Sequence, residues 1–420
     1  MTRRTIRRIA AFSIGGAALA CVVITSVPSP FVLLAGAGAI LCAVVAWKGG
    51  RGWLRVVSVN ACLVLLLFGA IEAAFGMLLT RRNRSFPEYP PQYFQPDDEL
   101  GGAPQKGAAA HVTKRAGSAV VYDVNYTIGA NGLRVSPPDH GTDAKACALF
   151  FGDSFMFGEG LADDQTIPWR VGALTNGDVR AFNFGFHGFG AQQMLAALQG
   201  DRVAKAADCR PTHIIYEAIP DHVARSAGYY SFMRHGPRYE LEPNAVRPDS
   251  VSLRGHFDDA ENNRSAIGAV IANAMAKSWV YRWLTSLSPQ PDEDDLRRYV
   301  AIVTSAARVA ATRYPGVRFD VLYWDIHGES PMDEKVLPAL RAAGLNVFDA
   351  EQILPGFREN PSSFALSPYD AHPGARADDL LARYIVQQWF HRGGGATTGR
   401  IGVVPRGFRI VTFANSSDGT

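Results

Sequence analysis

The chain has 420 residues, of which 47% are hydrophobic and only 19% are charged, and its formal net charge is +3. This near balance of charge leaves no basic footprint for nucleic acid, so we expect no nucleic-acid partner. An average soluble domain carries about 25% charged residues, so the low fraction here predicts that lipid solvates part of the chain.

The excess apolar content lies near the amino terminus and predicts a transmembrane region over residues 1–80. Three apolar runs there each approach the ~20 residues that a helix needs to cross a bilayer. The expected helices are about 9–27, 31–47 and 56–79. Arginines precede the first run, and basic residues separate the second run from the third, so the positive-inside rule predicts a cytoplasmic amino terminus. Three crossings would make this a multi-pass inner-membrane protein whose remaining chain is periplasmic or extracellular.

Two features complicate this topology. Arg81, Arg82 and Arg84 follow the third run, where three crossings place positive charges on the outer side. Glu72 lies inside the third run, where an ionisable group is costly and can mark a partner or a polar path. We prefer the simpler interpretation that Glu72 reaches from near the outer end of the helix toward the interface.

The next two segments are expected to lead into the main domain. Residues 81–117 are rich in proline, glutamine, glycine and alanine and predict a tether. Residues 118–145 alternate apolar and polar side chains around Asn131 and Gly132, a pair suited to a tight turn. They predict a β-hairpin.

Residues 146–392 predict an α/β domain, because strand and helix patterns alternate along them. The expected strands are 146–151, 179–184, 214–218, 319–323 and 345–348. The expected helices are 165–174, 191–206, 292–313, 331–343 and 375–392. Such alternation indicates a parallel sheet covered on both faces, with its ligand site at the carboxyl ends of the strands.

Three motifs follow predicted strands or precede the last helix. They are "GDS" at 152–154, "NFGFHGFGAQQ" from Asn183, and "DAHPGARADDLLARYI" from Asp370. In this order and separation they resemble the first, second and fifth sequence blocks of the SGNH/GDSL hydrolase superfamily, over roughly Ala146 to Trp389. The resemblance implies a flavodoxin-like, three-layer α/β/α fold and ester hydrolysis without a cofactor.

The chemistry of the residues agrees with a serine nucleophile. A serine hydroxyl needs a general base within hydrogen-bond reach and a third group that fixes the base. We expect Ser154 as nucleophile, His372 as base and Asp370 as its orienting acid. The superfamily usually has two residues between acid and base, whereas only Ala371 intervenes here, so either Asp370 orients His372 imperfectly or a backbone carbonyl shares the task. Alternatively, Asp370 and His372 only cap the final helix.

The resemblance also implies an oxyanion hole. Its backbone donors carry over to Ser154 and Gly188. Its third donor is an asparagine side chain, but Asp221 aligns there, and an ionised aspartate cannot donate. We expect the next residue, His222, to replace it; alternatively, this segment only turns the chain.

Two further residues of these blocks are expected to support the site. Asp153 precedes the nucleophile, and Asn183 is expected to brace the loop that bears Gly188. His187 lies beside the predicted oxyanion hole but receives no role, because a lone loop histidine is more often structural.

Other segments are less specific. Residues 225–291 form a long insertion that predicts either a lid or glycan platform, or an ordinary cover for the sheet edge. Cys147 and Cys209 precede neighbouring strands, so they form either a disulfide or two free buried thiols. No metal-ligand spacing is present, and residues 393–420 are expected to be a poorly ordered tail.

The sequence therefore predicts a membrane-anchored serine hydrolase that acts on ester (O-acyl) bonds and deacylates or transacylates an envelope glycan. Its expected partners are an acylated small molecule or glycan as substrate, the lipid bilayer, and a membrane partner protein. The alternative is a catalytically inactive domain of the same fold that serves as a glycan-binding or assembly subunit.

Overall fold

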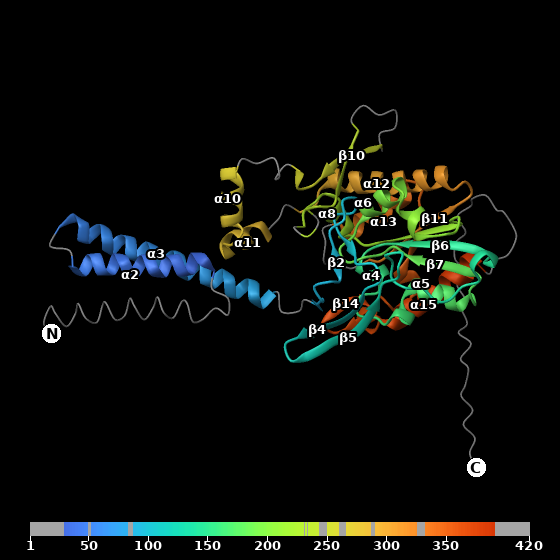
Figure 1. Ribbon diagram of the computed structural model, residues 1–420, viewed down its shortest axis with the longest axis horizontal. Coiled ribbons are helices and arrows are strands. Elements are labelled where there is room, and N and C mark those ends of the chain that lie inside the picture. Colours follow the sequence, from blue (N-terminus) through green and yellow to red (C-terminus); the bar gives the residue numbers. More distant parts are fainter. Residues whose placement is uncertain are drawn as a thin grey trace, which may run out of the picture.

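The computed structural model describes residues 29–48, 52–82, 87–230, 232, 234–242, 250–259, 266–286, 290–325 and 332–390. The predicted helix at 9–27 and the predicted tail at 393–420 lie outside the described residues. Figure 1 shows a long helical hairpin beside a larger α/β domain, with two short helices between them.

The hairpin consists of α2 (Pro30–Lys48) and α3 (Trp53–Arg82), which pack along each other. By length and composition, Pro30–Lys48 and Trp53–Leu79 could each cross a membrane. They correspond to the second and third predicted runs. Because the two helices are antiparallel, the start of α2 and the end of α3 lie at the same end of the hairpin.

A parallel sheet forms the centre of the α/β domain, and its strand order is β12-β11-β8-β6-β7. The strands are β6 (Ala146–Phe151), β7 (Val179–Asn183), β8 (His213–Ala218), β11 (Arg318–Tyr323) and β12 (Asn346–Asp349). Counted along the chain within this sheet, the order is 2-1-3-4-5, as in flavodoxin. All five strands lie within one residue of their predicted bounds.

Helices cover both faces of the sheet, as Figure 1 shows. Successive residues of β6 enter opposite layers: Leu149 and Phe151 join one core cluster, and Ala148 and Phe150 join the other. The first layer contains α6 (Ala191–Gln199), α8 (His222–Ser226), α12 (Glu293–Arg313) and α13 (Asp333–Ala342). The second contains α4 (Ser154–Phe157), α5 (Ile167–Leu174), α14 (Ala350–Ile353) and α15 (Ala375–Ile385).

Two predicted helices are interrupted. The helix expected over 191–206 is divided into α6 and α7 (Arg202–Ala206), because Gly200 between them favours neither helix nor strand. The helix expected over 375–392 is α-helical to Ile385 and continues as a π-helical turn over Val386–Phe390.

Short elements complete the domain. The hairpin β13 (Ala365–Ser367) and β14 (Asp370–Pro373) precedes α15, and the hairpin β9 (Pro237–Leu241) and β10 (Val251–His256) begins the insertion. The insertion continues with α10 (Ala266–Met275) and α11 (Trp279–Ser286). In the part of the chain that the structure describes, 3-10 turns cover Gly141–Asp143, Asp163–Gln165 and Pro361–Ser363.

The predicted tether over 81–117 is wrong, because residues 87–116 contain strands and core residues. The strands in this segment are β1 (Pro87–Glu88), β2 (Phe94–Gln95), β3 (Ala103–Pro104) and β4 (Ala109–Ala116), and β5 (Ala119–Thr127) follows it. Tyr93 and Leu100 are buried in the main core. Strands of two residues need few backbone donors, which is why a proline-rich segment can form them.

The predicted hairpin is also displaced. The chain reverses at Gly117, whose φ of +63° suits glycine, and β4 pairs with β5 there. Asn131 and Gly132 instead close a separate small turn that brings Ile128 beside Arg134.

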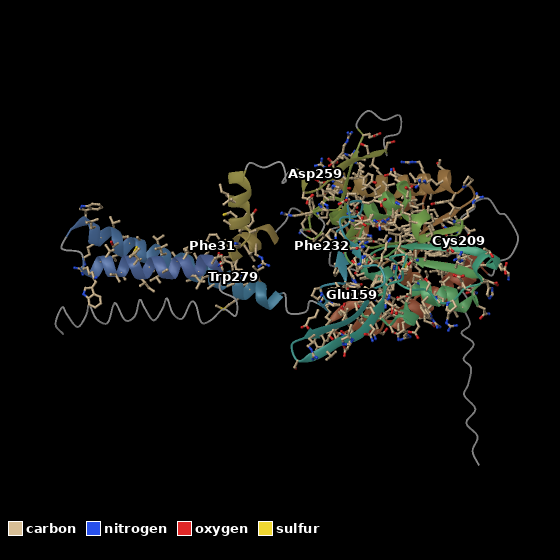
Figure 2. The ribbon with its side chains drawn as sticks, viewed as in Figure 1. Phe31, Glu159, Cys209, Phe232, Asp259 and Trp279 are labelled. Carbon is tan, nitrogen blue, oxygen red and sulfur yellow. A yellow bond between two sulfur atoms is a disulfide. The ribbon has the colours of Figure 1, made fainter. Side chains whose placement is uncertain are left out.

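A disulfide links Cys147 in β6 to Cys209 before β8, with their Cα atoms 6.1 Å apart. Figure 2 marks Cys209 on the side of the domain remote from the helical hairpin. The bond fixes the segment that enters β8 to the neighbouring strand.

Candidate active site

Ser154 lies immediately beyond the carboxyl end of the central strand β6. Gly152 is the first residue after β6. A Cβ at this position would come 2.6 Å from Glu217 Oε2 and 2.7 Å from Met156 Cβ, so only glycine fits. Asp153 then caps α4 by accepting a hydrogen bond of 2.8 Å from the Phe155 N–H. Ser154 is thereby the first residue of α4 and lines a large pocket.

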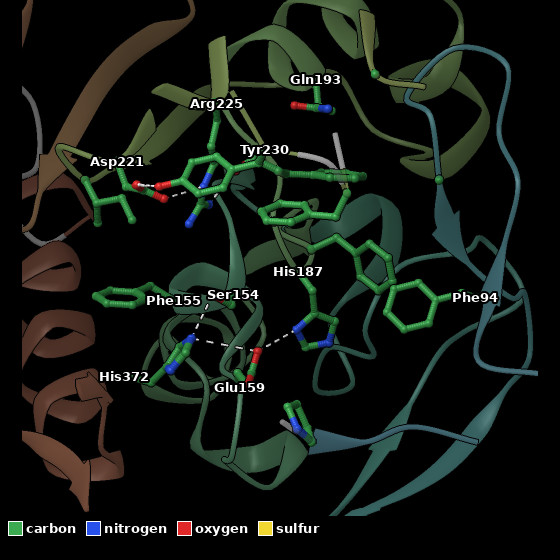
Figure 3. A pocket seen from close by; sticks show the side chains of 18 of the residues that line it. Phe94, Ser154, Phe155, Glu159, His187, Gln193, Asp221, Arg225, Tyr230 and His372 are labelled. Carbon is green, nitrogen blue, oxygen red and sulfur yellow. Dashed lines mark hydrogen bonds and ion pairs between the residues drawn. The ribbon is translucent and has the colours of Figure 1, made fainter. Parts of the chain in front are cut away.

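Strand β14 supplies the two other predicted catalytic residues. Successive side chains alternate in a strand, so Asp370 and His372, two residues apart, lie on the same side. His372 Nδ1 lies 2.6 Å from Asp370 Oδ1. His372 Nε2 lies 2.8 Å from Ser154 Oγ (Figure 3). The spacing with one intervening residue therefore brings acid and base into direct contact, and no carbonyl has to share the task.

Lys114 fixes Asp370 from the opposite direction. Its Nζ, on β4, donates a hydrogen bond of 2.8 Å to Asp370 Oδ2. Burial alone would raise the pKa of Asp370, but the hydrogen bonds and charges of His372 and Lys114 hold it below its usual value. Asp370 is therefore ionised and can only accept a hydrogen bond from the Nδ1–H of His372, which leaves Nε2 to interact with Ser154.

A second carboxylate, Glu159, lies on the other side of His372. It follows α4, and its Oε2 lies 3.8 Å from His372 Nε2 and 2.8 Å from His187 Nδ1 (Figure 3). Tyr122 donates a hydrogen bond of 3.0 Å to its Oε1. Burial would raise the pKa of Glu159, but the charge of His372 and the hydrogen bond from His187 lower it to about 2.

These carboxylates determine the protonation of His372. Burial would lower its pKa, but the charge of Glu159 and the hydrogen bond and charge of Asp370 together raise it above the usual value. The imidazolium form that arises when His372 takes the serine proton is thus stabilised.

His187 is held by tyrosines as well as by Glu159. Tyr93 Oη lies 2.9 Å from its Nε2 and Tyr89 Oη lies 3.3 Å from its Nδ1. Its ring also packs 4.4 Å from Phe157, measured between ring centroids. His187 therefore orients Glu159 from the side remote from His372.

The loop after β7 forms the next part of the pocket wall. Asn183 Nδ2 donates to Met156 O, and its Oδ1 accepts from the Gly185 N–H at 3.0 Å, so it ties this loop to α4. Gly188 lines the same pocket as Ser154, and its φ of +73° requires glycine. The structure thus brings Gly188 and Ser154 to one cavity.

The expectation for His222 is wrong. Its ring is fully buried, stacks on Tyr216 and lies 2.7 Å from Tyr216 Oη through Nδ1. Its Nε2 lies 3.4 Å from Asp153 Oδ2. The side chain thus turns under the strand end toward Asp153, away from the pocket, and burial lowers its pKa.

Arg225, one turn further along α8, lines the pocket instead. Its Nε donates 2.9 Å to Asp221 Oδ2, and its Nη1 donates to Asp153 and to the carbonyl of Phe189. Tyr230 donates to the other oxygen of Asp221 (Figure 3). The site therefore holds a guanidinium close to the place where the resemblance implied an asparagine.

The pocket has a volume of about 1240 Å³, enough for a ligand larger than an acetyl group. Aromatic rings contribute much of its lining: Tyr89, Phe94, Phe155, Phe186, Phe189, Tyr230, Phe232 and Tyr369. Tyr89 and Phe94 come from the segment that had been expected to be a tether.

Among the described residues, two groups of side chains have ligand atoms close enough for a metal ion: Asp153, Glu217 and His222, and Glu159, Asp370 and His372. Each group already contacts a protein cation: Arg225 binds Asp153, and Lys114 binds Asp370. The second group is also the one that contacts Ser154. Its arrangement suits proton transfer better than metal binding.

Sequence reasoning missed Lys114, Glu159 and Arg225. Lys114 occupies the inward position of the alternating segment "AHVTKRA", which was a detectable signal. Glu159 stands alone between two glycines, and Arg225 follows Asp221 by one helical turn, so neither shows a pattern that distinguishes it from a surface charge.

No protein-family model and no curated relative match this sequence. Solved structures with some similarity include a lipolytic protein of the G-D-S-L family from Desulfitobacterium hafniense, with 11% identity, a TM-score of 0.32, and coverage of 58% of this chain and 98% of that one. An acetylxylan esterase from Geobacillus stearothermophilus shows 13% identity and a TM-score of 0.32 over 58% of this chain and 94% of that one. An acetyl xylan esterase from Butyrivibrio proteoclasticus shows 11% identity and a TM-score of 0.31 over 62% and 68%.

Proposed function

We propose that this chain is a membrane-anchored SGNH-type serine hydrolase that cleaves ester bonds of an acylated substrate. The observation that carries the proposal is the hydrogen-bonded series Ser154, His372 and Asp370 at the edge of a large pocket. A base within 2.8 Å of a serine hydroxyl, and an ionised acid within 2.6 Å of that base, are what serine activation needs.

In the reaction, Ser154 Oγ attacks the ester carbonyl while His372 Nε2 takes the hydroxyl proton. The tetrahedral intermediate collapses, and His372 returns the proton to the departing alkoxide, which leaves as an alcohol. Water then attacks the acyl-serine, again with His372 as base, and releases the acid. A sugar hydroxyl in place of water would transfer the acyl group instead.

The developing oxyanion requires hydrogen-bond donors. The backbone N–H groups of Ser154 and Gly188 are proposed as two of them. Arg225 is proposed as the third, because its guanidinium lines the same pocket and is anchored beside Ser154 through Asp153. A guanidinium donates hydrogen bonds and also carries the opposite charge, so it compensates for the missing asparagine side chain.

The lining of the pocket supports an acylated sugar as substrate. Aromatic rings offer apolar faces against which sugar rings pack, and the pocket volume exceeds what an acyl group alone fills. The proposed membrane anchor supports a glycan of the cell envelope as the substrate. The additional predicted helix over 9–27 would place the catalytic domain on the outer side of the membrane, which supports the same substrate.

Labelling with a fluorophosphonate tests the proposal. The full-length protein in detergent is expected to react covalently, whereas Ser154→Ala and His372→Ala are expected to abolish labelling. Ser363→Ala, a change in an exposed 3-10 turn, serves as the control and keeps full labelling. A folded wild-type protein that does not react would overturn the enzyme proposal and favour the glycan-binding or assembly subunit.

A further inference from the structure

The helices α10 and α11 of the insertion lie beside the membrane hairpin (Figure 1), and none of their described residues lines the pocket that contains Ser154. Helix α11 packs against α3, about two hundred residues earlier in the sequence. The insertion thus connects the α/β domain back to the end of the hairpin nearer to that domain.

Glu72 anchors α11 to α3. Its side chain is fully buried and accepts hydrogen bonds from the backbone N–H groups of Trp279 at 2.6 Å and Val280 at 3.1 Å. It also accepts from the hydroxyls of Ser278 at 3.0 Å and Ser29 at 3.1 Å. The first N–H groups of a helix have no partner within it, so Glu72 caps α11. The hydrogen bonds therefore support the alternative that Glu72 marks a partner, and that partner is α11 of the same chain.

Aromatic packing reinforces this junction. Gly76 lies so close to the Trp279 ring that a Cβ would come within 2.2 Å of it. Phe75 contacts Trp283 with ring centroids 4.6 Å apart. Figure 2 marks Trp279 and Phe31 at this end of the hairpin. Side chains from both sides of the contact thus fix the position of α11 on α3.

The length of α3 determines the depth in a bilayer at which α11 contacts α3. Nineteen residues separate Trp53 from Glu72, which at 1.5 Å per residue is about 29 Å. A hydrocarbon core is about 30 Å thick. Trp47 and Trp53 are exposed at the opposite end of the hairpin, as expected for aromatic side chains at a membrane interface. With those tryptophans at one interface, Glu72 and α11 lie at the other.

Helix α10 exposes apolar side chains at this level. Its sequence, AIGAVIANAM, contains no charged residue. Val270 is 68% exposed, Ile271 57% and Met275 42%, and in α11 Leu284 is 55% exposed. A helix that is apolar on all sides is normally covered by protein or by lipid. The exposed surface of α2 and α3 is also apolar and includes Leu34 and Leu63.

We propose that α10 and α11 form an interfacial helix pair, with the apolar side of α10 buried among lipid at the boundary between head groups and acyl chains. The occupant is lipid because the exposed surface continues that of the two membrane helices and lies at the interfacial level. The pair holds the catalytic domain at a fixed orientation on the bilayer. This inference rests on the membrane anchoring within the proposed function.

Depth-dependent quenching tests it. Full-length protein with Cys21, Cys42 and Cys62 replaced by alanine would carry one new cysteine, Ile271→Cys or Met275→Cys, labelled with a fluorophore. The protein is reconstituted in phosphatidylcholine and phosphatidylglycerol vesicles with nitroxides near the glycerol or the methyl end of the acyl chains. We expect a strong loss of fluorescence with the shallow nitroxide and a smaller loss with the deep one.

Two control positions separate the possible failures. Leu63→Cys, exposed on α3, should be quenched by the deep nitroxide, and Ala311→Cys, exposed on α12 beside the strand starts, by neither. Quenching at Leu63 without quenching at Ile271 and Met275 would overturn the inference alone. Absence of quenching at Leu63 would overturn the membrane anchor as well. Cross-linking of Ile271→Cys between two chains would assign this surface to a second copy and overturn the lipid contact.

Discussion

Two buried glutamates, Glu72 in the apolar helical hairpin and Glu159 in the pocket that contains Ser154, are both held by hydrogen bonds but differ in the kind of donor. Glu72 accepts four hydrogen bonds from hydroxyl and backbone donors, and all of them belong to α11 or to the start of α2. Glu159 instead contacts two imidazoles and a tyrosine hydroxyl. A buried carboxylate must be satisfied in either place. The neutral donors around Glu72 give it a structural role, in which it holds α11 on α3. The imidazoles beside Glu159 can gain or lose a proton, so this carboxylate can influence proton transfer at His372.

The largest expected effect on the catalytic side comes from Arg225. Arg225→Gln removes the charge next to the proposed oxyanion, so kcat for ester hydrolysis should fall by about 10²- to 10³-fold. The measurement is steady-state kinetics beside a thermal melt, because the same change leaves the buried Asp153 without its cation. Arg225→Lys keeps that charge and should recover part of kcat.

Arg170→Gln provides the matched control for Arg225. Arg170 also pairs with an aspartate, Asp379, but at a partly exposed site on α5 and α15. Its loss should leave kcat unchanged. If Arg225→Gln is folded and retains wild-type kcat, the proposed third donor is excluded.

A smaller effect, on pH dependence, is expected at Glu159. His372 must be neutral to take the serine proton, and the negative charge of Glu159 contributes to its raised pKa. Glu159→Gln removes that charge, so the pKa of His372 should fall, and activity should begin at a lower pH than in the wild type. The rate of fluorophosphonate labelling against pH measures the shift.

Asp123→Asn is the control for Glu159, because Asp123 is an exposed carboxylate on β5 with its own partners. It should leave the profile in place. A profile that moves to higher pH, or that does not move, in Glu159→Gln would contradict the assignment of Glu159 as the residue that raises the pKa.

The smallest effect on catalysis is expected at Glu72. Glu72→Ala removes the acceptor for the first N–H groups of α11. The free energy that keeps α11 folded against α3 should therefore fall by about 1–3 kcal/mol. Hydrogen exchange of the amides of Trp279 and Val280 should accelerate, while hydrolysis of a soluble ester in detergent should not change. Glu88→Gln, at an exposed position of β1, is the control. Unchanged exchange in Glu72→Ala would refute the capping role.

Sequence patterns anticipated most of the central sheet because its strands are short apolar runs between turn residues. They also indicated Ser154 and His372, because block order carries information that survives when overall identity is low. The fate of His222 was not predictable. Whether a residue at a strand end points into the crevice or under the sheet depends on a single turn of α8.

The segment 87–116 and Glu72 show a different limit. The strands β1 to β3 contain two residues each, too few for a recognisable alternation. Glu72 has partners more than two hundred residues away, at Ser278 and Trp279. Local patterns report on local structure, so contacts of this separation have no signature in one sequence.

The short connection between α3 and the pocket would limit where the proposed membrane-anchored hydrolase works. Helix α3 ends at Arg82, and Tyr89 already lines the pocket, so seven residues of at most about 3.5 Å each keep this wall within roughly 25 Å of the helix end. A substrate anchored to the same bilayer is confined to that thin layer and meets the pocket at a high effective concentration, whereas a freely diffusing substrate has no such advantage. Surface density, rather than bulk concentration, would then set the rate of turnover.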